Sequence, residues 1–236
     1  MTAKKLIAFD LDGTLTQHKS QLDDVNRAVL NRLAKKYHLL MLGAGSCERI
    51  YRQMGEFPIE IIGNYGMQHS VIENGAFKLI KDHKAPVDRE FFTRTIEELR
   101  RKFGFTDYYG DSVEFHASGA VTFPILGTAA PLDQKLAYDP DRLKRRAIYA
   151  EVCQAFAQYN VFIGGSSSFD ITAGEFNKYH ALKNFCCDNG IPLESAVYVG
   201  DDFGEGGNDS PVILGGVKCI VIDDYRNLKN ALAHLL

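Results

Sequence analysis

Residues 6–16 read Leu-Ile-Ala-Phe-Asp-Leu-Asp-Gly-Thr-Leu-Thr, an apolar run that ends in two aspartates and a glycine-containing turn. A short run of this kind predicts a buried strand, with Asp10 and Asp12 where the chain leaves it. If the turn brings both carboxylates to one point, their repulsion requires a cation or a shared proton, and Mg2+ is the simplest cation. The alternative is an ordinary Asp-Gly turn after a strand, which needs no chemistry.

Phosphoryl transfer is the chemistry that such a pair of carboxylates suits. An aspartate beside Mg2+ can attack a phosphoryl group and form an aspartyl-phosphate. A second carboxyl can give a proton to the leaving group and later take one from the attacking water. The motif therefore predicts a magnesium-dependent enzyme with Asp10 and Asp12 at its centre.

The composition is that of an ordinary globular chain. Its 236 residues are 45% hydrophobic, which allows one large core or a core with an inserted lobe. The formal net charge of -3 argues against a general nucleic-acid binder. Five scattered cysteines without a Cys-x-x-Cys pair indicate neither a zinc site nor a disulfide framework, and they fit a reducing cytoplasm. No apolar run approaches transmembrane length and strand-like sequence begins almost at once, so we expect neither export nor membrane spanning.

A second predicted strand, at residues 39–42, ends in a turn of small residues. Gly43, Gly45 and Ser46 lie in that turn, and residues 47–54 have helical character. Backbone N–H groups at such a helix start, together with the Ser46 hydroxyl, form an anion site, so Gly45 and Ser46 are candidate phosphate-binding residues. Ser46 is an equally good helix N-cap, and the residues alone leave both interpretations open.

Segments on either side of an insertion alternate between strand and helix. Before it we expect a helix from Asp23 or Asp24 to about residue 36, a strand at 59–63 and a hairpin turn at Asn74-Gly75. After it we expect a helix from Lys178 to about residue 189, strands at 196–200 and 219–222, and a helix at 226–236. This alternation predicts a doubly wound α/β core with a parallel sheet. Asp10, Ser46 and Asp201 would meet at the carboxyl ends of its strands.

Residues 82–173 break this alternation and predict an inserted α+β cap. We expect a helix at 87–103, antiparallel strands around 113–115 and 121–123, a polar link at 133–139, an amphipathic helix at 141–158, and strands at 161–163 and 169–172. On the second helix Leu143 and Val152 belong to the apolar side, whereas Arg142, Lys144, Arg145 and Arg146 read as a solvated face. The predicted core is then residues 1–81 and 174–236.

Four motifs in order resemble those of the haloacid dehalogenase superfamily, over nearly the whole chain. They are Asp10-x-Asp12-Gly13-Thr14, Ser46 after a strand, Lys178 at a helix start, and Gly200-Asp201-Asp202 with Asn208-Asp209. The resemblance implies a Rossmann-like core and Mg2+ as cofactor. It implies that Asp10 is the nucleophile and a metal ligand, and that Asp12 is the general acid/base and a metal ligand through its backbone carbonyl. It also implies that Lys178 is a catalytic phosphate holder, that Thr14, Gly45 and Ser46 bind phosphate, and that Asp201 ligates the metal with the accessory Asp209. Without the resemblance, Lys178 is a solvated lysine in a first helical turn, where the helix dipole disfavours it.

The cap resembles that of the eukaryotic-type phosphomannomutases within this superfamily. The likeness rests on Gly164-Gly165-Ser166-Ser167-Ser168-Phe169-Asp170 followed by Phe176-Asn177-Lys178. It implies that Ser168 and Asp170 contact a sugar; the alternative is that they cap local turns. That family holds a second phosphate with cap arginines, but alignment puts His116 and Gly127 at two of those positions and Gln134 or Lys135 near a third. Lys19 approximates one further basic position beyond the nucleophile.

Three functions compete. The leading hypothesis is a Mg2+-dependent phosphatase that hydrolyses a small phosphorylated metabolite, a sugar phosphate, through an aspartyl-phosphate. The second is a phosphomannomutase-like isomerase, against which the missing cap arginines argue. The third is an idle metabolite-binding module, against which the presence of Asp10, Asp12, Lys178 and Asp201 argues. We expect a monomer or homodimer with no nucleic-acid or membrane partner, and we leave open the sugar and whether Asp202 or Asp209 touches the metal.

Overall fold

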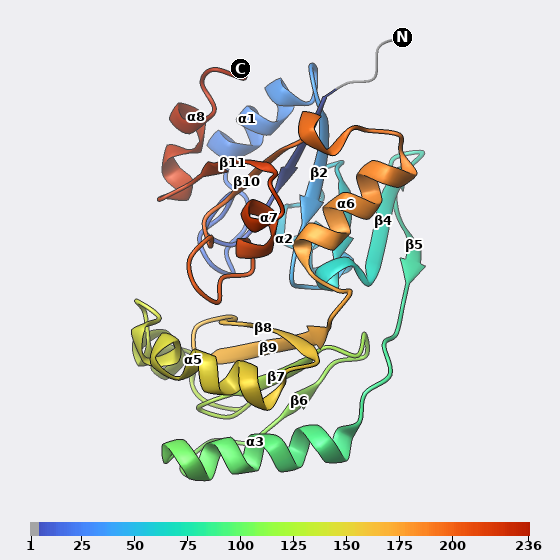
Figure 1. Cartoon of the computed structure of the whole chain (residues 1–236). Helices are drawn as coiled ribbons and strands as arrows, with labels where there is room; N and C mark the ends of the chain where they lie inside the picture. The colour runs from blue at the N-terminus through green and yellow to red at the C-terminus, as the bar shows by residue number, and fades with distance from the viewer. Residues whose placement is uncertain (1–4) are drawn as a thin grey trace. The chain divides into compact units, whose positions relative to one another are not determined.

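The structure is a computed structural model that describes residues 5–236 (Figure 1). The chain forms two compact units. Unit 1 comprises the described residues up to 83 together with 177–204 and 209–236, and unit 2 comprises 84–176 and 205–208. Residues 1–4, which fall in the predicted core segment, lie outside the described residues. None of the helices within residues 5–236 has the length and apolar character needed to span a bilayer.

Unit 1 is built on a seven-stranded sheet in the order β11-β10-β1-β2-β3-β4-β5. Its strands are β1 (Leu6–Phe9), β2 (His38–Leu42), β3 (Glu60–Gly63), β4 (Gln68–Glu73), β5 (Ala76–Asp82), β10 (Val197–Gly200) and β11 (Lys218–Val221). The first five strands in the spatial order are parallel, and β4 and β5 form an antiparallel hairpin at the edge. The parallel sheet and the hairpin turn at Asn74-Gly75 are thus confirmed.

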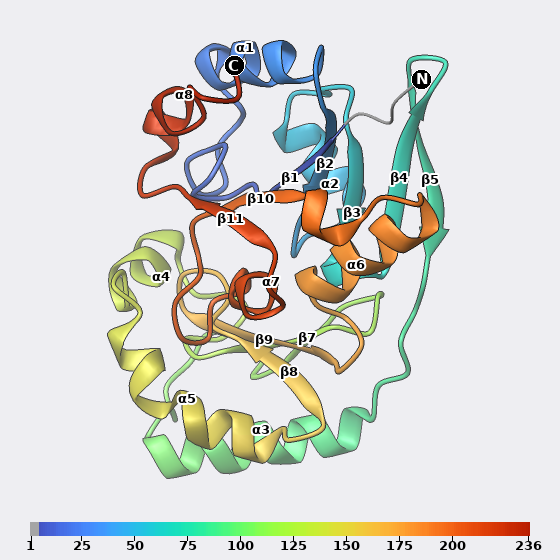
Figure 2. The ribbon, with the colours of Figure 1, turned by 45° about the horizontal axis from the view of Figure 1, so that its top comes forward.

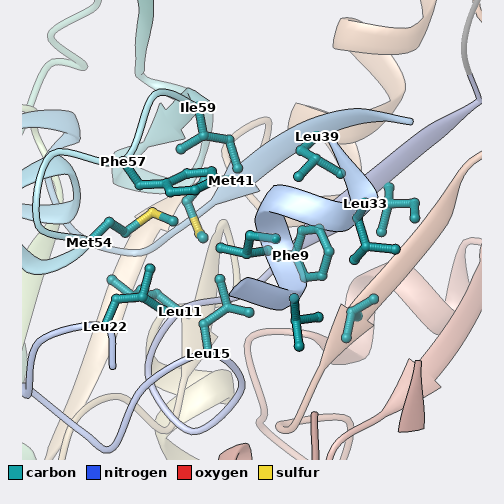
Figure 3. Packing of buried hydrophobic residues seen from close by; sticks show 14 of the residues in the cluster. Phe9, Leu11, Leu15, Leu22, Leu33, Leu39, Met41, Met54, Phe57 and Ile59 are labelled. Atoms are coloured by element: carbon teal, nitrogen blue, oxygen red, sulfur yellow. The ribbon is translucent and has the colours of Figure 1, made fainter. Parts of the chain in front are cut away.

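Helices cover both faces of this sheet, as the doubly wound prediction requires (Figure 2). Because side chains alternate along a strand, Ile7 and Phe9 of β1 enter one apolar cluster while Leu6 and Ala8 enter the other. The first cluster, part of which is seen in Figure 3, includes residues of α1 (Asp24–Leu33), α2 (Cys47–Gln53) and α8 (Leu228–Ala231). The second includes residues of α6 (Lys178–Asp188) and α7 (Ser210–Leu214).

The helix starts predicted in unit 1 are confirmed more closely than the helix ends. Asp23 caps α1 by accepting a hydrogen bond from the Asn26 backbone at 2.8 Å. The expected helix at 226–236 is wrong in extent: α8 has four residues and follows a 3-10 turn at Tyr225–Asn227. Asp224 caps that turn through a hydrogen bond to the Arg226 backbone, so the chain tightens there instead of starting a long helix.

Unit 2 has a four-stranded antiparallel sheet in the order β6-β7-β9-β8. Its elements are α3 (Arg89–Phe103), β6 (Glu114–Phe115), β7 (Val121–Pro124), α4 (Leu132–Tyr138), α5 (Leu143–Ala155), β8 (Tyr159–Phe162) and β9 (Ser168–Ala173). One apolar cluster joins Phe92 and Ile96 of α3 and Val152 of α5 to Phe123 and Phe169 of the sheet. The unit is therefore α+β, with helices gathered on one sheet face.

Two expectations for unit 2 are wrong. The polar link at 133–139 is helix α4, whose Leu132 and Leu136 stay exposed and so give no buried stripe to recognise. On α5 the expected burial is wrong at two positions, since Leu143 is 61% exposed and Arg145 is 1% exposed, whereas Val152 is buried as expected. Arg145 is buried because its Nε pairs with Asp139 Oδ2 at 2.8 Å and its guanidinium also donates to backbone carbonyls. A hydropathy pattern cannot show that a charged side chain has a buried partner.

A histidine-carboxylate cluster joins three neighbouring strands of unit 1. Glu60, the first residue of β3, accepts from His38 of β2 at 2.9 Å and from His69 of β4 at 2.7 Å. Burial alone would raise the pKa of Glu60, but the hydrogen bonds and charges of the two histidines outweigh it and lower that pKa to about 2. The folded state therefore favours the ionised carboxylate more than the unfolded state does.

We expect Glu60→Gln to destabilise unit 1 by about 1–3 kcal/mol near pH 6. Because the folded pKa of about 2 lies below the ordinary glutamate pKa of 4.5, the contribution of Glu60 is complete above about pH 4.5 and is lost as the pH falls towards 2. Urea unfolding at several pH values measures this. Glu73→Gln, which removes an exposed pair with Lys78, is the control. A Glu60 variant with the same pH dependence as wild type would contradict the assignment.

Candidate active site

The carboxyl end of β1 places Asp10 beside the first residue of α6. Asp10 continues from β1, is 7% exposed, and donates its backbone N–H to Val199 of β10. The Lys178 ammonium is 1% exposed and donates to Asp10 Oδ1 at 2.6 Å and to Asp209 Oδ1 at 2.7 Å. Lys178 is therefore not a solvated helix-start lysine but a buried cation between two carboxylates.

Asp209 is fully buried and accepts hydrogen bonds on both of its oxygens. Oδ1 accepts from Lys178 and, at 2.5 Å, from the Tyr198 hydroxyl. Oδ2 accepts from the backbone N–H groups of Asp201 and Asp202 at 3.1 and 3.0 Å. Asp209 thereby fixes the turn after β10, and this turn presents the Asp201 side chain.

Asp201 lies against the turn that follows β1. Its Oδ1 accepts a hydrogen bond from the Thr14 hydroxyl at 2.9 Å, and Thr14 is fully buried. Gly13 has a φ of +95°, and a β-carbon at this position would overlap the Asp201 carboxylate. The glycine of the first motif is therefore required both by its backbone conformation and by the approach of Asp201.

The charges of this cluster do not balance. Burial, together with repulsion from Asp209 and Asp201, raises the pKa of Asp10 although Lys178 lowers it. Burial and repulsion from Asp209 likewise raise the pKa of Asp201 to about 6. Burial opposes the charge on Lys178, but Asp10 and Asp209 outweigh it and raise its pKa. Against burial, the same lysine lowers the pKa of Asp209. Three carboxylates share one ammonium. The unbalanced negative charge is therefore unfavourable, and the raised pKa values of Asp10 and Asp201 reflect this.

A divalent cation fits this arrangement. Asp10, Asp201 and Asp209 each offer a carboxylate oxygen, and these oxygens lie within 4.8 Å of one another. Hard oxygen ligands suit Mg2+, and a cation would supply the positive charge that the buried cluster lacks. Since both oxygens of Asp209 already accept two hydrogen bonds each, Asp10 and Asp201 are the better placed ligands.

The Asp12 carboxylate lies among donors from the following loop and from α2. Oδ1 accepts from the Gln53 side-chain amide at 2.7 Å and from the backbone N–H of Lys19 at 2.7 Å. The Arg49 guanidinium is 3.7 Å from Oδ2. Lys19 itself has an exposed side chain and contacts Asp12 through its main chain.

Ser46 is the N-cap of α2, which was one of its two possible roles, the other being phosphate binding. Its hydroxyl accepts from the Arg49 backbone N–H at 3.2 Å. The Gly45 carbonyl accepts from the Asn64 backbone at 2.8 Å, and a β-carbon on Gly45 would overlap the Arg49 side chain. The backbone N–H of Cys47 also has a protein partner, since it donates to Gln68 Oε1 at 3.0 Å. The anion-binding role of Gly45 and Ser46 therefore stays a prediction.

Ser168 and Asp170 lie on β9 in unit 2. The Ser168 hydroxyl donates to the Gly164 carbonyl at 3.0 Å, as its local-turn interpretation predicts. Asp170 Oδ1 accepts from the Thr122 hydroxyl at 3.1 Å, and His116 Nε2 lies 2.8 Å from the same hydroxyl. These contacts form a continuous polar chain from His116, which follows β6, through Thr122 of β7 to Asp170 of β9.

Sequence reasoning missed three residues of the unit 1 site: Tyr198, Arg49 and Gln53. Tyr198 lies within an apolar strand, and nothing in the sequence marked it as part of a polar site. In the structure its hydroxyl donates to Asp209, and burial and this neighbouring carboxylate raise its pKa. Arg49 and Gln53 are four residues apart on α2, so they share a helix face. That spacing was visible in the sequence, but its proximity to Asp12 was not.

Comparison with known proteins agrees with this arrangement of motifs. A family model of haloacid dehalogenase-like hydrolases matches residues 7–104, which carry Asp10, Asp12 and Ser46. Over these residues the chain is similar to the haloacid dehalogenase-like hydrolases. The chain is also similar to phosphomannomutases: it is 22% identical to the phosphomannomutase of Encephalitozoon cuniculi over 249 residues, covering 97% of this chain and 94% of the relative.

Solved structures of other proteins share the fold. The IMP-nucleotidase of Plasmodium falciparum, in an N-terminally truncated form, superposes with a TM-score of 0.69 at 17% identity, covering 99% of this chain and 70% of that one. A haloacid dehalogenase-like hydrolase from B. subtilis superposes with a TM-score of 0.63 at 16% identity, covering 98% and 100%. The chain therefore shares its fold with these solved structures.

Proposed function

We propose that the protein is a Mg2+-dependent phosphatase that hydrolyses a sugar phosphate through an aspartyl-phosphate on Asp10. The observation that carries the proposal is the buried ion pair of Lys178 with Asp10, beside Asp201 and Asp209, at the carboxyl end of a parallel sheet. A nucleophilic carboxylate needs a neighbouring cation to approach a phosphate dianion, and Lys178 provides one. The five cysteines are free thiols, which supports placing the reaction in a reducing cytoplasm.

In the proposed reaction an oxygen of Asp10 forms a bond to phosphorus as the bond to the sugar oxygen breaks. Asp12 protonates the departing sugar oxygen and then accepts the proton of the water that cleaves the aspartyl-phosphate, releasing phosphate and restoring Asp10. Lys178 offsets the charge of the transferred group. Mg2+, held by Asp10, Asp201 and the Asp12 carbonyl, would supply further positive charge when bound. In this proposal unit 2 is the cap that selects the sugar.

Two buried arginines and a glycine of unit 2 favour hydrolysis over mutase activity. Arg145 is committed to Asp139 and to backbone carbonyls, and Arg100 is buried among the carbonyls of residues 105, 112, 124 and 125. Gly127, one of the positions where the resemblance expects an arginine, has a φ of +84°, and a side chain there would overlap the Tyr109 carbonyl. A cap that grips a second phosphate needs free guanidinium groups, which these positions do not offer.

The polar face of the unit 2 sheet suits neutral hydroxyl groups. Glu114, Thr122 and Asp170 are neighbours in the strand register, and His116 joins them through the Thr122 hydroxyl. The carboxylates, the hydroxyl and the imidazole of this face can exchange hydrogen bonds with sugar hydroxyls, and the two carboxylates repel a second phosphate. We therefore take the preferred substrate to be a hexose monophosphate.

A sugar phosphomutase is the second candidate, favoured by the similarity to a phosphomannomutase along 97% of the chain. In that case a sugar phosphate, and not water, would receive the phosphoryl group from Asp10. The core chemistry is common to both candidates, so the acceptor decides between them.

We predict release of inorganic phosphate from hexose monophosphates, with little interconversion of the 1- and 6-phosphates even when a hexose 1,6-bisphosphate is supplied. Each missing guanidinium-phosphate contact removes roughly 1.5–3 kcal/mol, so bisphosphate capture should be weak. Phosphate release and isomer formation, followed together with Mg2+ across hexose, pentose and polyol phosphates, test this. Rapid isomerisation with much slower phosphate release would establish the mutase instead.

A further inference from the structure

The side chain of Gln53 contacts Asp12 from a different element of unit 1. Gln53 is the last residue of α2, whereas Asp12 follows β1, and the Gln53 amide nitrogen donates to Asp12 Oδ1 at 2.7 Å. We propose that Gln53 is a positioning residue that, with Arg49, orients the Asp12 carboxylate for proton transfer to the leaving group. This inference rests on the proposed phosphatase function, in which Asp12 is the general acid and base.

Both ends of the Gln53 amide are engaged, so its orientation is determined. The nitrogen donates to Asp12 and, at 3.1 Å, to the Thr16 hydroxyl. The oxygen accepts from the Arg49 guanidinium at 2.9 Å. Because the oxygen is held by a donor that cannot lose its protons, the nitrogen is the atom that must face Asp12.

Arg49 completes the contact from one turn earlier on α2. Its guanidinium lies 3.7 Å from Asp12 Oδ2, the oxygen that Gln53 does not contact. Its side chain also lies against Gly45, where a β-carbon would displace it. The absence of a side chain at Gly45 therefore allows Arg49 to fold back towards Asp12.

The loop after β1 contributes the third donor. Lys19 has a φ of +58°, a left-handed conformation that is uncommon for a residue with a β-carbon, and its N–H donates to Asp12 Oδ1 at 2.7 Å. The Gln53 backbone carbonyl also accepts from Leu22 N–H at 3.0 Å, which ties the same loop to the end of α2. The loop after β1 and helix α2 thus both donate to Asp12 Oδ1, and these two hydrogen bonds restrict rotation of the Asp12 carboxylate.

A carboxyl group that serves as acid and then as base must stay within reach of two different oxygens in turn. Free rotation of Asp12 would lower the fraction of time in which it is aligned with either oxygen. Loss of the Gln53 donor should therefore harm the proton-transfer steps and spare steps in which no proton is needed.

The test compares Gln53→Leu with wild type on a hexose phosphate and on p-nitrophenyl phosphate. For the hexose phosphate, whose alkoxide needs a proton, kcat/KM should fall roughly 10–100-fold, part of the full effect of a general acid. For p-nitrophenyl phosphate, whose phenolate leaves unprotonated, kcat/KM should stay within about twofold. Because hydrolysis of the aspartyl-phosphate still needs Asp12 as base, this substrate should give a burst of p-nitrophenolate followed by a slowed steady state.

Arg52→Gln is the matched control, since Arg52 neighbours Gln53 on α2 but pairs with the exposed Glu48. It should match wild type on both substrates, and thermal unfolding checks that all variants fold. Gln53→Glu, which sets a carboxylate against Asp12, should show the same selectivity with a larger loss. An equal loss of kcat/KM on both substrates, or no loss, would overturn the inference.

Asp12→Asn separates this inference from the proposed function. If Asp12→Asn shows the leaving-group dependence and Gln53→Leu does not, Gln53 is no positioning residue and the phosphatase mechanism stands. If Asp12→Asn itself shows no such dependence, the role of Asp12 is wrong and the inference fails with it.

Discussion

Asp10→Asn is expected to fold normally and to lose turnover by on the order of 10⁴-fold or more, because the variant has no nucleophilic carboxylate. Asparagine has the same shape and can still accept a hydrogen bond from Lys178, which keeps its second partner Asp209. Removing one of three clustered carboxylates also relieves part of the repulsion among them. Urea unfolding and phosphate release, measured on one preparation, provide the comparison.

A phosphate analogue gives the matched ligand experiment. Beryllium fluoride with Mg2+ should raise the unfolding temperature of wild type, since a ligand that binds the folded state stabilises it, and should leave Asp10→Asn unchanged. Retention of full activity by Asp10→Asn would remove the proposed mechanism. Loss of both activity and folded structure would instead show that Asp10 is needed for the fold.

Lys178→Met should be the most destabilising of the site variants. The ammonium is 1% exposed and pairs with Asp10 and Asp209, so its removal leaves buried carboxylates without their cation. Breaking a buried ion pair from one side costs about 3–5 kcal/mol, and activity should be severely impaired with no change in sugar preference. Urea unfolding and a substrate panel measure the two effects.

Lys183→Met on the same helix is the control, because Lys183 is exposed. Asp209→Asn offers a second approach, since it keeps the Lys178–Asp10 pair and removes one carboxylate charge. It should destabilise less than Lys178→Met. If Lys178→Met were as stable as Lys183→Met, the buried ion pair would not hold the site together.

The strand-end position of the site could be predicted from the sequence. Asp10 follows a short apolar run, and Ser46 and Asp201 follow others, so a parallel sheet must bring these residues to one edge. Lys178 at a helix start was recognised through its place in the ordered motifs, but its burial was not predictable from α6 alone. A charged residue reads as solvated until its partners are known, and Arg145 of unit 2 was misread for the same reason.

The contacts around Asp12 could not be predicted from the sequence, because they depend on tertiary geometry. Gln53 and Arg49 look like polar positions on a short helix, and 41 residues separate Gln53 from Asp12. Their meeting depends on the packing of α2 against the sheet and on the left-handed turn at Lys19. Neither is encoded in a local pattern, because each needs the tertiary arrangement of unit 1.

Detection of the covalent intermediate tests the central claim most directly. Wild type is mixed briefly with Mg2+ and p-nitrophenyl phosphate, quenched in acid and digested for mass spectrometry. We predict a phosphoryl group on the peptide that contains Asp10, located on that residue, and its absence from Asp10→Asn. Phosphate release by wild type with no phosphorylated Asp10 at any quench time, or a phosphoryl group on another residue, would contradict the account.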